Sequence, residues 1–117
     1  MGTNYYAVKN RPSVSEPIHI GKCSIGWLFH FQAQDDPYHR PPVVWQTYDQ
    51  VRMWLRDNTM TGEYVIMNEY DEIIPYDDFI ALVEERQNDE RCRNNPDNFH
   101  GGCRNVDGYR FSDGDFW

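Results

Sequence analysis

Long apolar runs are missing from this sequence, and their absence argues against a helix that spans a membrane. The uninterrupted hydrophobic stretches are only a few residues long, whereas a bilayer-crossing helix needs about 20 apolar residues. The first six residues also lack the basic start and the apolar stretch of a signal peptide. We therefore expect a soluble protein of the cytoplasm with no membrane partner.

Cysteine is scarce, and its odd number does not suit a disulfide framework. Cys23, Cys92 and Cys103 are therefore expected to be reduced thiols. The spacing Cys92-x7-His100-x2-Cys103 contains residue types that bind zinc, but it lacks the close C-x2-C pair and the fourth ligand of a typical zinc site. Free cysteines without a cofactor are the expectation, and a zinc site is the alternative.

Basic residues are outnumbered, because 11 lysines and arginines stand against 19 aspartates and glutamates, for a net charge of -8. The imbalance is concentrated in residues 57–90, where eleven carboxylates accompany a single arginine, Arg86. Since such a segment repels phosphate groups, direct nucleic-acid binding is not expected. The segment is interpreted either as a solubilising surface or as a patch for a basic partner, including mimicry of a nucleic acid.

Signatures of catalysis are also missing. The chain has no Walker A motif, nucleophile elbow, H-E-x-x-H pattern or C-x-x-C pattern. We therefore expect a protein that is not an enzyme. The alternative is a small metal-dependent hydrolase built on His19, His30, Glu69 and Glu72, since that chemistry needs a base or metal ligands close together.

Aromatic residues, by contrast, are plentiful, at 15% of 117 residues. This content favours a folded chain, and the length suits one domain, because domains usually hold about 100–150 residues. We expect a single domain over residues 1–117. Its parts are an aromatic, strand-rich front (1–45), a helix–hairpin–helix middle (46–88) and a polar tail with one short strand (89–117).

Strands are predicted in the front from alternation with a period of two and from aromatic and β-branched content. The predicted strands are Thr3–Val8, Ile18–Ile20 and Trp27–Phe31. If residues 21–26 turn the chain, Ile20 faces Trp27 on the buried side. His19 and His30 then lie on the opposite side.

Two helices are predicted in the middle of the chain. Thr47 and Gln50 form a capping box, after which apolar residues recur at helical spacing until about Asp57. A second helix is predicted over residues 76–87. The intervening segment, residues 64–74, is predicted to form a β-hairpin.

These elements predict an α+β fold, with a small, mainly antiparallel sheet packed against two helices. Helices separated by a hairpin suit packing on one face of a sheet. The core is expected to contain the helix residues Tyr48, Val51, Trp54, Leu55, Phe79, Leu82 and Val83 and the strand residues Ile18, Ile20, Trp27, Phe29 and Phe31.

The segment of residues 21–26 most resembles a binding site. Its two glycines permit unusual backbone angles, so exposed amides together with Lys22 can hold a phosphate or a carboxylate. Tyr5 and Tyr6 offer an aromatic surface for a base, but they project to opposite faces of a strand and only one of them can stack on it. The predicted ligand-binding residues are Tyr5, Tyr6, His19, Gly21, Lys22, Ser24 and His30. An ordinary hairpin turn with a surface lysine is the alternative interpretation.

Glu69, Asp71 and Glu72 are candidates for contact with a protein partner. If Tyr70 and Asp71 form a two-residue loop, Glu69 and Glu72 face each other, and like charges placed in this way are destabilising. We therefore expect either a longer loop or an arginine that compensates for the two carboxylates.

Several separated blocks of the sequence resemble those of small, uncharacterised tailed-bacteriophage proteins. The blocks are T-N-Y-Y at 3–6, H-I-G-K at 19–22 followed by S-x-G-W-x-F at 24–29, N-E-Y at 68–70, and D-x-Y-x-F at 107–111 followed by G-x-F at 114–116. Relatives carry a C-x2-C-like element between the first two blocks. This chain has no cysteine there, so any metal-binding role of that element is not expected here. The resemblance implies a phage origin, but no established activity and no catalytic residues.

The function expected from these features is non-catalytic binding in the cytoplasm of an infected bacterial host. The ligand is predicted to be a small anionic molecule, such as a nucleotide signal of host defence that the protein sequesters. Because so small a protein encloses little of a ligand, the site is expected near a homo-oligomer interface. The alternative is an acidic inhibitor, or nucleic-acid mimic, that binds a host defence protein.

Overall fold

The aromatic front of the chain forms the centre of a seven-stranded β-sheet. In this computed structural model, residues 2–10, 16–99 and 102–113 are described. The strands are β1 (Gly2–Lys9), β2 (Ile18–Ser24), β3 (His30–Gln32), β4 (Gln34–Asp36), β5 (Val43–Trp45), β6 (Tyr64–Asn68), β7 (Ile73–Ile74), β8 (Arg104–Val106) and β9 (Tyr109–Ser112). The helices are α1 (Tyr48–Met60), α2 (Tyr76–Asn88) and α3 (Glu90–Arg93).

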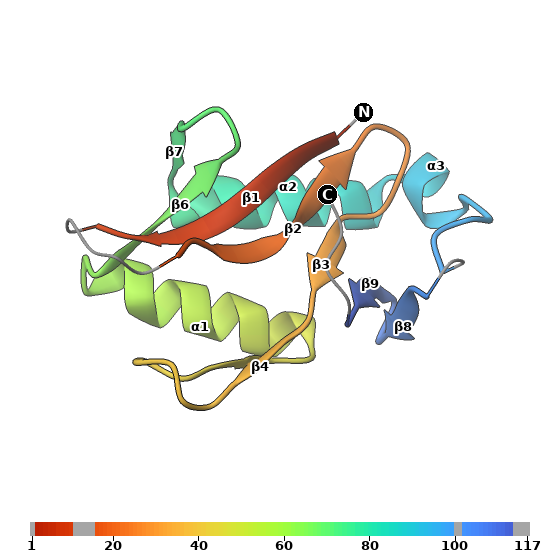
Figure 1. Cartoon of the computed structure of the whole chain (residues 1–117). Coiled ribbons are helices and arrows are strands. Elements are labelled where there is room, and N and C mark those ends of the chain that lie inside the picture. The colour runs from red at the N-terminus through yellow and green to blue at the C-terminus, as the bar shows by residue number, and fades with distance from the viewer. Residues whose placement is uncertain (1, 11–15, 100–101, 114–117) are drawn as a thin grey trace.

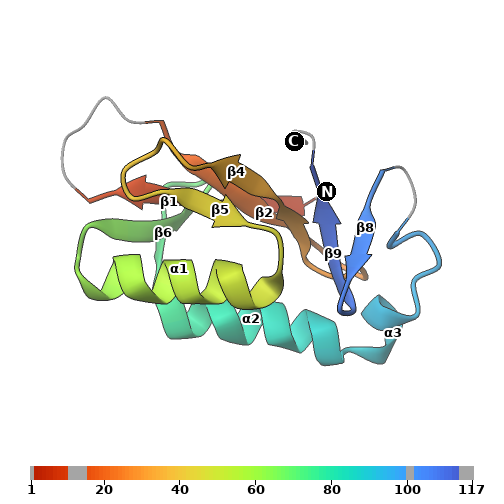
Figure 2. The same ribbon diagram turned by 90° about the horizontal axis from the view of Figure 1, so that it is seen from below.

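The large sheet has the strand order β7-β6-β1-β2-β3-β9-β8, and β4 pairs with β5 in a separate small sheet. The pairing of β3 with β9 is parallel, and the other described pairs are antiparallel. Helices α1 and α2 cover the same face of the large sheet (Figures 1 and 2). We call the opposite face the distal face. The structure confirms the predicted α+β fold, in which a mainly antiparallel sheet packs against two helices.

Aromatic rings fill the space between the large sheet and the two helices. Phe29 meets Phe79 edge to face with ring centroids 5.5 Å apart, and Phe31 stacks on Phe111 at 5.0 Å. Such ring pairs add to the stabilisation from burying apolar area. The predicted core residues that are buried are Ile18, Ile20, Phe29, Phe31, Tyr48, Val51, Leu55, Phe79 and Val83, and Trp54 and Leu82 pack against them partly buried. Within the described ranges, no helix is long and apolar enough to cross a membrane.

The predicted turn over residues 21–26 is shorter than expected, because strand β2 continues to Ser24, places Lys22 opposite His30 and leaves only Ile25 and Gly26 in the turn. The physical reason is close strand approach at Gly21, where a Cβ atom would lie 2.2 Å from the carbonyl oxygen of His30. Gly21 is therefore needed inside the strand rather than in a turn. Of the two glycines in this segment, Gly26, with a φ of 84°, is the one in a turn conformation that favours glycine.

Trp27 is not part of the core, contrary to the prediction. Its side chain is half-buried in the β2–β3 loop, where the guanidinium carbon of Arg110 lies 4.8 Å from the ring centroid. The next residue, Leu28, is buried. Strand β3 begins only at His30, so Trp27 lies outside the strand and does not face Ile20. The alternating pattern that predicted the burial of Trp27 therefore does not extend to this residue.

Both predicted helices are present, and the first one begins at the predicted cap. The backbone N–H of Gln50 donates to Thr47 Oγ1 over 3.2 Å. In a capping box, the side chain of Gln50 would accept from the N–H of Thr47. Here it accepts instead from the N–H of the preceding residue, Gln46, at 2.7 Å. Helix α1 extends to Met60, beyond the predicted end near Asp57. Helix α2 ends one residue after its prediction.

Four short elements were not predicted from the sequence. Strands β4 and β5 border the loop with paired prolines, and α3 and β8 lie in the polar tail. Elements of three or four residues are too short to show a hydrophobic period. The small sheet is attached to the large one by Trp45, which is fully buried and whose Nε1 donates to the carbonyl oxygen of Gln32 at 2.7 Å.

Candidate functional site

A row of polar side chains crosses four neighbouring strands on the distal face. The pairing of β1, β2, β3 and β9 places Asn4, Lys22, His30 and Arg110 opposite one another in that order. Residues directly paired across a sheet project to the same face. These four residues, which we call the distal row, come from sequence positions up to 106 apart (110 − 4).

The predicted site residues divide between the two faces of the sheet. Tyr6, His19, Lys22, Ser24 and His30 belong to the distal face, since they share its register. A Cβ atom on Gly2 would lie 2.3 Å from Ser24 Oγ and 2.6 Å from Lys22 Cε, so both side chains fold over this glycine.

Tyr5 and Gly21 lie on the face that packs against the helices. The Tyr5 ring is 5.9 Å from Phe29 and 5.6 Å from Phe79, centroid to centroid, and burial raises its pKa. Tyr5 is therefore a core residue. Tyr6, whose ring centroid lies 5.3 Å from that of His19, is the tyrosine on the distal face.

A buried polar network joins the first two strands to the β6–β7 loop. His19, only 6% exposed, donates from Nε2 to Asn4 Oδ1 over 3.0 Å. The backbone N–H of Asn4 donates to Glu69 Oε1 over 2.8 Å. The irregular register between Tyr5 and Tyr6 lets His19 take this position beside Tyr6. His19 is therefore a structural residue beneath the surface, whereas Lys22 is half-exposed.

His30 lies in a cluster with two residues that the sequence analysis did not connect to it. Ser112 Oγ lies 2.6 Å from His30 Nε2, and Cys103 Sγ lies 3.5 Å from the same nitrogen. Burial, followed by the nearby charge of Arg110, lowers the pKa of His30 to about 3. The imidazole is therefore neutral at physiological pH. The partners lie 73 and 82 positions away, so no local pattern could have revealed them.

Lys22 and Arg110 are cations of the distal row, and neither forms an ion pair with a carboxylate in the described part of the chain. Other arginines are paired, as in the 2.7 Å contact between Arg104 and Asp113. Arg110 Nε also has no hydrogen-bond partner among the described residues. The distal row thus contains two cations that form no ion pair with a described carboxylate, in a protein whose net charge is -8.

The backbone amides predicted to hold an anion are not available as predicted. From Gly21 to Ser24 the chain is paired with β1, and Gly21 and Lys22 also face β3. The N–H of Trp27 donates back to the carbonyl oxygen of Ser24 at 3.2 Å and closes the turn. Recognition of an anion by residues 21–24 therefore depends on their side chains.

The carboxylates of the β6–β7 loop are compensated by amides. The loop holds four residues, Glu69 to Glu72, because the N–H of Asn68 donates to the carbonyl oxygen of Glu72 at 3.1 Å. Asn68 Nδ2 donates to Glu72 Oε1 at 2.8 Å, and Glu69 accepts from Asn4. The two glutamates therefore do not face each other, and the arginine that we expected as one explanation is not needed. Asp71 adopts a φ of 62° at the turn.

The cysteines occupy two separate environments. Cys23 and the fully buried Cys92 both lie near the side chain of Arg86, and burial raises the pKa of the Cys23 thiol. Cys103 is half-buried beside His30 instead. His100 lies outside the described residues. In the part of the chain that the structure describes, no group of three His, Cys, Asp or Glu side chains is arranged to hold a metal ion.

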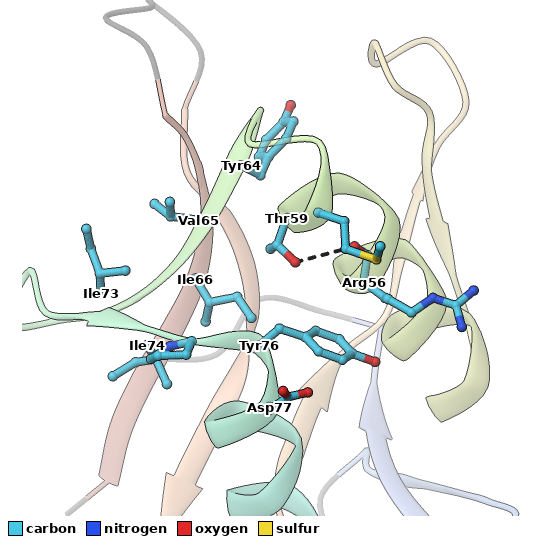
Figure 3. A pocket seen from close by; sticks show the side chains of 11 residues that line it. Arg56, Thr59, Tyr64, Val65, Ile66, Ile73, Ile74, Tyr76 and Asp77 are labelled. Carbon is cyan, nitrogen blue, oxygen red and sulfur yellow. Dashed lines mark hydrogen bonds between the residues drawn. The ribbon is translucent and has the colours of Figure 1, made fainter.

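An apolar groove of about 550 Å³ lies at the other end of the molecule, between the end of α1, the β6–β7 hairpin and the start of α2 (Figure 3). Met60 and Ile73 line it and are 79% and 62% exposed. Arg56 and Asp77 supply charge at its border. The groove adjoins the acidic segment 57–90, and it is the second candidate site.

Three of the separated sequence blocks noted above lie in strands that contribute to the distal row. T-N-Y-Y lies in β1, H-I-G-K in β2, and the D-x-Y-x-F block ends in β9, all within the large sheet. Comparison with protein-family models, with curated proteins and with solved structures finds no match to this chain.

Proposed function

We propose that this chain is a non-catalytic binding protein that captures a small anionic, nucleotide-type ligand on the distal face of its sheet. The observation that carries the proposal is the pair of cations, Lys22 and Arg110, on either side of His30 in one register row. Neither cation forms an ion pair with a described carboxylate. A hydrogen bond from a charged donor is worth about 1.5–3 kcal/mol, more than one between neutral groups.

The aromatic ring of Tyr6, beside the distal row, suits the base of such a ligand. Tyr6 lies two residues along β1 from Asn4, which corresponds to about 7 Å at the rise of a strand. Stacking of a base on an aromatic ring is worth about 1–3 kcal/mol. Phosphate groups held by Lys22 and Arg110 and a base on Tyr6 together account for the recognition that we propose.

The resemblance to bacteriophage proteins supplies a setting for this capture. In the cytoplasm of an infected bacterium, a protein that sequesters a nucleotide signal would counter a host defence. A flat sheet face encloses little of a ligand, so we propose that a second copy of the chain covers the site in a homo-oligomer. No catalytic residue and no cofactor enter the proposal.

Titration with a panel of nucleotides, followed by calorimetry and thermal unfolding, tests the proposal. We expect at least one member to bind and to raise the unfolding temperature. Lys22→Ala should leave the fold intact and weaken binding about tenfold to a hundredfold, as loss of one charge-assisted contact predicts. Lys9→Ala is the matched control, because Lys9 lies at the far end of β1. The proposal fails if no member binds at millimolar concentration, or if Lys22→Ala binds like the wild type.

A second candidate function is inhibition of a basic protein partner, and the apolar groove favours it. The groove exposes Met60 and Ile73 next to a strongly acidic segment, a combination that suits a partner segment with alternating basic and apolar residues. A synthetic Lys/Leu-alternating peptide is the probe, and its binding should weaken as salt is raised. Met60→Asp should abolish that binding, whereas Met53→Asp, on an exposed part of α1, should not. Equal binding by the two variants would exclude the groove.

A further inference from the structure

A carboxylate lies beside the first residue of the distal row, where β1 borders β6. The N–H of Glu69 donates to the carbonyl oxygen of Asn4 over 3.0 Å. In return, the N–H of Asn4 donates to Glu69 Oε1 over 2.8 Å, and Asn4 Nδ2 lies 3.5 Å from the same oxygen. These contacts hold the exposed Glu69 next to a side chain of the distal row. The row therefore has an acidic end at Glu69 and a basic part at Lys22 and Arg110.

Tyr6 supplies an aromatic ring close to this carboxylate. It lies two residues along β1 from Asn4, and diagonal neighbours in a sheet are about 7–8 Å apart, within reach of an aromatic side chain. Burial, followed by the charge of Glu69, raises the pKa of Tyr6, so the two side chains interact electrostatically. A base that stacks on Tyr6 therefore has its edge within reach of Glu69.

The second oxygen of Glu69 discriminates among the bases. Both contacts with Asn4 use Oε1, and no hydrogen bond among the described residues uses Oε2. A carboxylate accepts hydrogen bonds and donates none. Guanine presents two adjacent donors, N1–H and the 2-amino group, on its Watson–Crick edge. Adenine and cytosine present an acceptor nitrogen beside their amino group, and a carboxylate repels that nitrogen, so guanine fits this position best.

We propose that the ligand of the distal face is a guanine nucleotide, with its base on Tyr6 and its Watson–Crick edge at Glu69. This inference rests on the proposed capture of a nucleotide. Lys22 lies two strands from Glu69, about 10 Å at the spacing of strands in a sheet, and Arg110 lies two strands further. The phosphates therefore lie at the basic part of the row while the base lies at its acidic end. Glu69 is the residue that determines specificity.

Calorimetry with nucleoside diphosphates tests the inference on the unaltered protein. Inosine diphosphate differs from guanosine diphosphate only by the missing 2-amino group, which is one of the two donors to Glu69. We expect it to bind about tenfold to a hundredfold more weakly, as loss of one charge-assisted hydrogen bond predicts. Adenosine diphosphate should bind at least as weakly as inosine diphosphate. Equal binding of the guanosine and inosine diphosphates would overturn the inference.

Glu69→Gln tests the role of the carboxylate. The glutamine oxygen can still accept from the N–H of Asn4, but its amide group then turns donors toward the base, so the preference for guanine over hypoxanthine should disappear. Glu72→Gln is the matched control in the same loop, because Glu72 accepts from Asn68 Nδ2 at 2.8 Å, and it should keep the preference.

The outcomes separate this inference from nucleotide capture itself. A preference for guanine that survives in Glu69→Gln would overturn the role of Glu69. If nucleotides bind without a preference for guanine, capture stands and the guanine assignment is wrong. If no nucleotide binds at millimolar concentration, capture fails and the assignment fails with it. Unfolding temperatures of both variants show whether they are folded, and the comparison of diphosphates on the wild type decides the assignment if Glu69→Gln is not.

Discussion

Gly21 lies where two strands approach so closely that a side chain has no room. An added Cβ would meet the backbone carbonyl oxygen of His30 at 2.2 Å and a ring carbon of Phe29 at 2.5 Å. A backbone atom cannot move aside as the end of a flexible side chain can. Because Gly21 has no side chain, β2 can lie close against β3. This close approach permits the register that creates the distal row.

Gly21→Ala should lower the free energy of unfolding by about 1–3 kcal/mol, the usual cost of overpacking. Urea denaturation followed by circular dichroism measures the change. Gly26→Asn is the control, because φ at Gly26 is 84°, no atom crowds its Cβ position, and asparagine tolerates positive φ. A Gly21→Ala protein as stable as the wild type would contradict the register of β2 and β3.

The half-buried His30 should make the stability of the protein depend on pH. Its pKa falls from 6.5 to about 3 on folding, mainly through burial and then through the charges of Arg110, His19 and Lys22. Cys103 and Ser112 also face it. Between these two pKa values the unfolded chain binds a proton that folded His30 does not, so the stabilisation present above pH 6.5 is lost as the pH falls towards 3.

Unfolding temperatures measured from pH 8 down to pH 4 test this expectation. The wild-type protein should lose stability across the interval, and His30→Gln should show a shallower slope because the titrating group is gone. His39→Gln keeps the wild-type slope, since His39 is in the β4–β5 loop and away from the cluster. Identical slopes for the wild type and His30→Gln would mean that His30 titrates normally.

At the scale of elements, helix α1 depends on its first turn. Thr47 Oγ1 accepts from the N–H of Gln50, which otherwise has no partner within the helix. Thr47→Ala should lower the free energy of unfolding by about 1 kcal/mol, measured by urea denaturation. Thr61→Ala removes a comparable hydroxyl at the exposed end of the helix, where it donates to Asn58, and should change stability much less. A larger loss of stability for Thr61→Ala than for Thr47→Ala would show that the hydrogen bond in the first turn is not the one on which the stability of the helix depends.

The short elements show where sequence patterns stop being informative. Helices α1 and α2 each have 13 residues, enough for apolar positions to recur several times, and both were predicted. Strand β5 has three residues, and the burial of Trp45 within it depends on contacts with Gln32 and Trp54. Those contacts connect segments that are not periodic, so they appear only once the chain is folded.

At the scale of the whole molecule, the tryptophans distinguish core from surface. Trp45 is fully buried, whereas Trp27 is half-buried beneath Arg110. Trp45→Ala should therefore lower the free energy of unfolding by about 3–5 kcal/mol, or prevent folding. Trp27→Ala should cost clearly less, because a partly exposed ring loses less buried area.

Chemical denaturation of the two variants side by side provides the measurement. Should Trp45→Ala fail to fold, Val43→Ala, at the other buried position of the same strand, keeps the comparison possible, with a smaller expected loss. A Trp27→Ala protein that loses as much stability as the Trp45 or Val43 variant would place Trp27 in the core, as the sequence pattern alone suggested.

The sequence by itself determined the fold class, both long helices and most of the core. Periodicity carries this information, because an apolar residue at every second or every third to fourth position can be buried only by one type of element. It also determined that His19 and His30 share a face, since each alternates with buried neighbours.

Only the tertiary structure decided which residues meet. The register of β2 against β3, set by close packing at Gly21, placed Lys22 opposite His30 and left Trp27 outside the core. The parallel pairing of β3 with β9 then brought Arg110 beside His30, from 80 positions away (110 − 30). Local propensity does not specify such partners, because contacts between distant segments depend on how all the elements pack together.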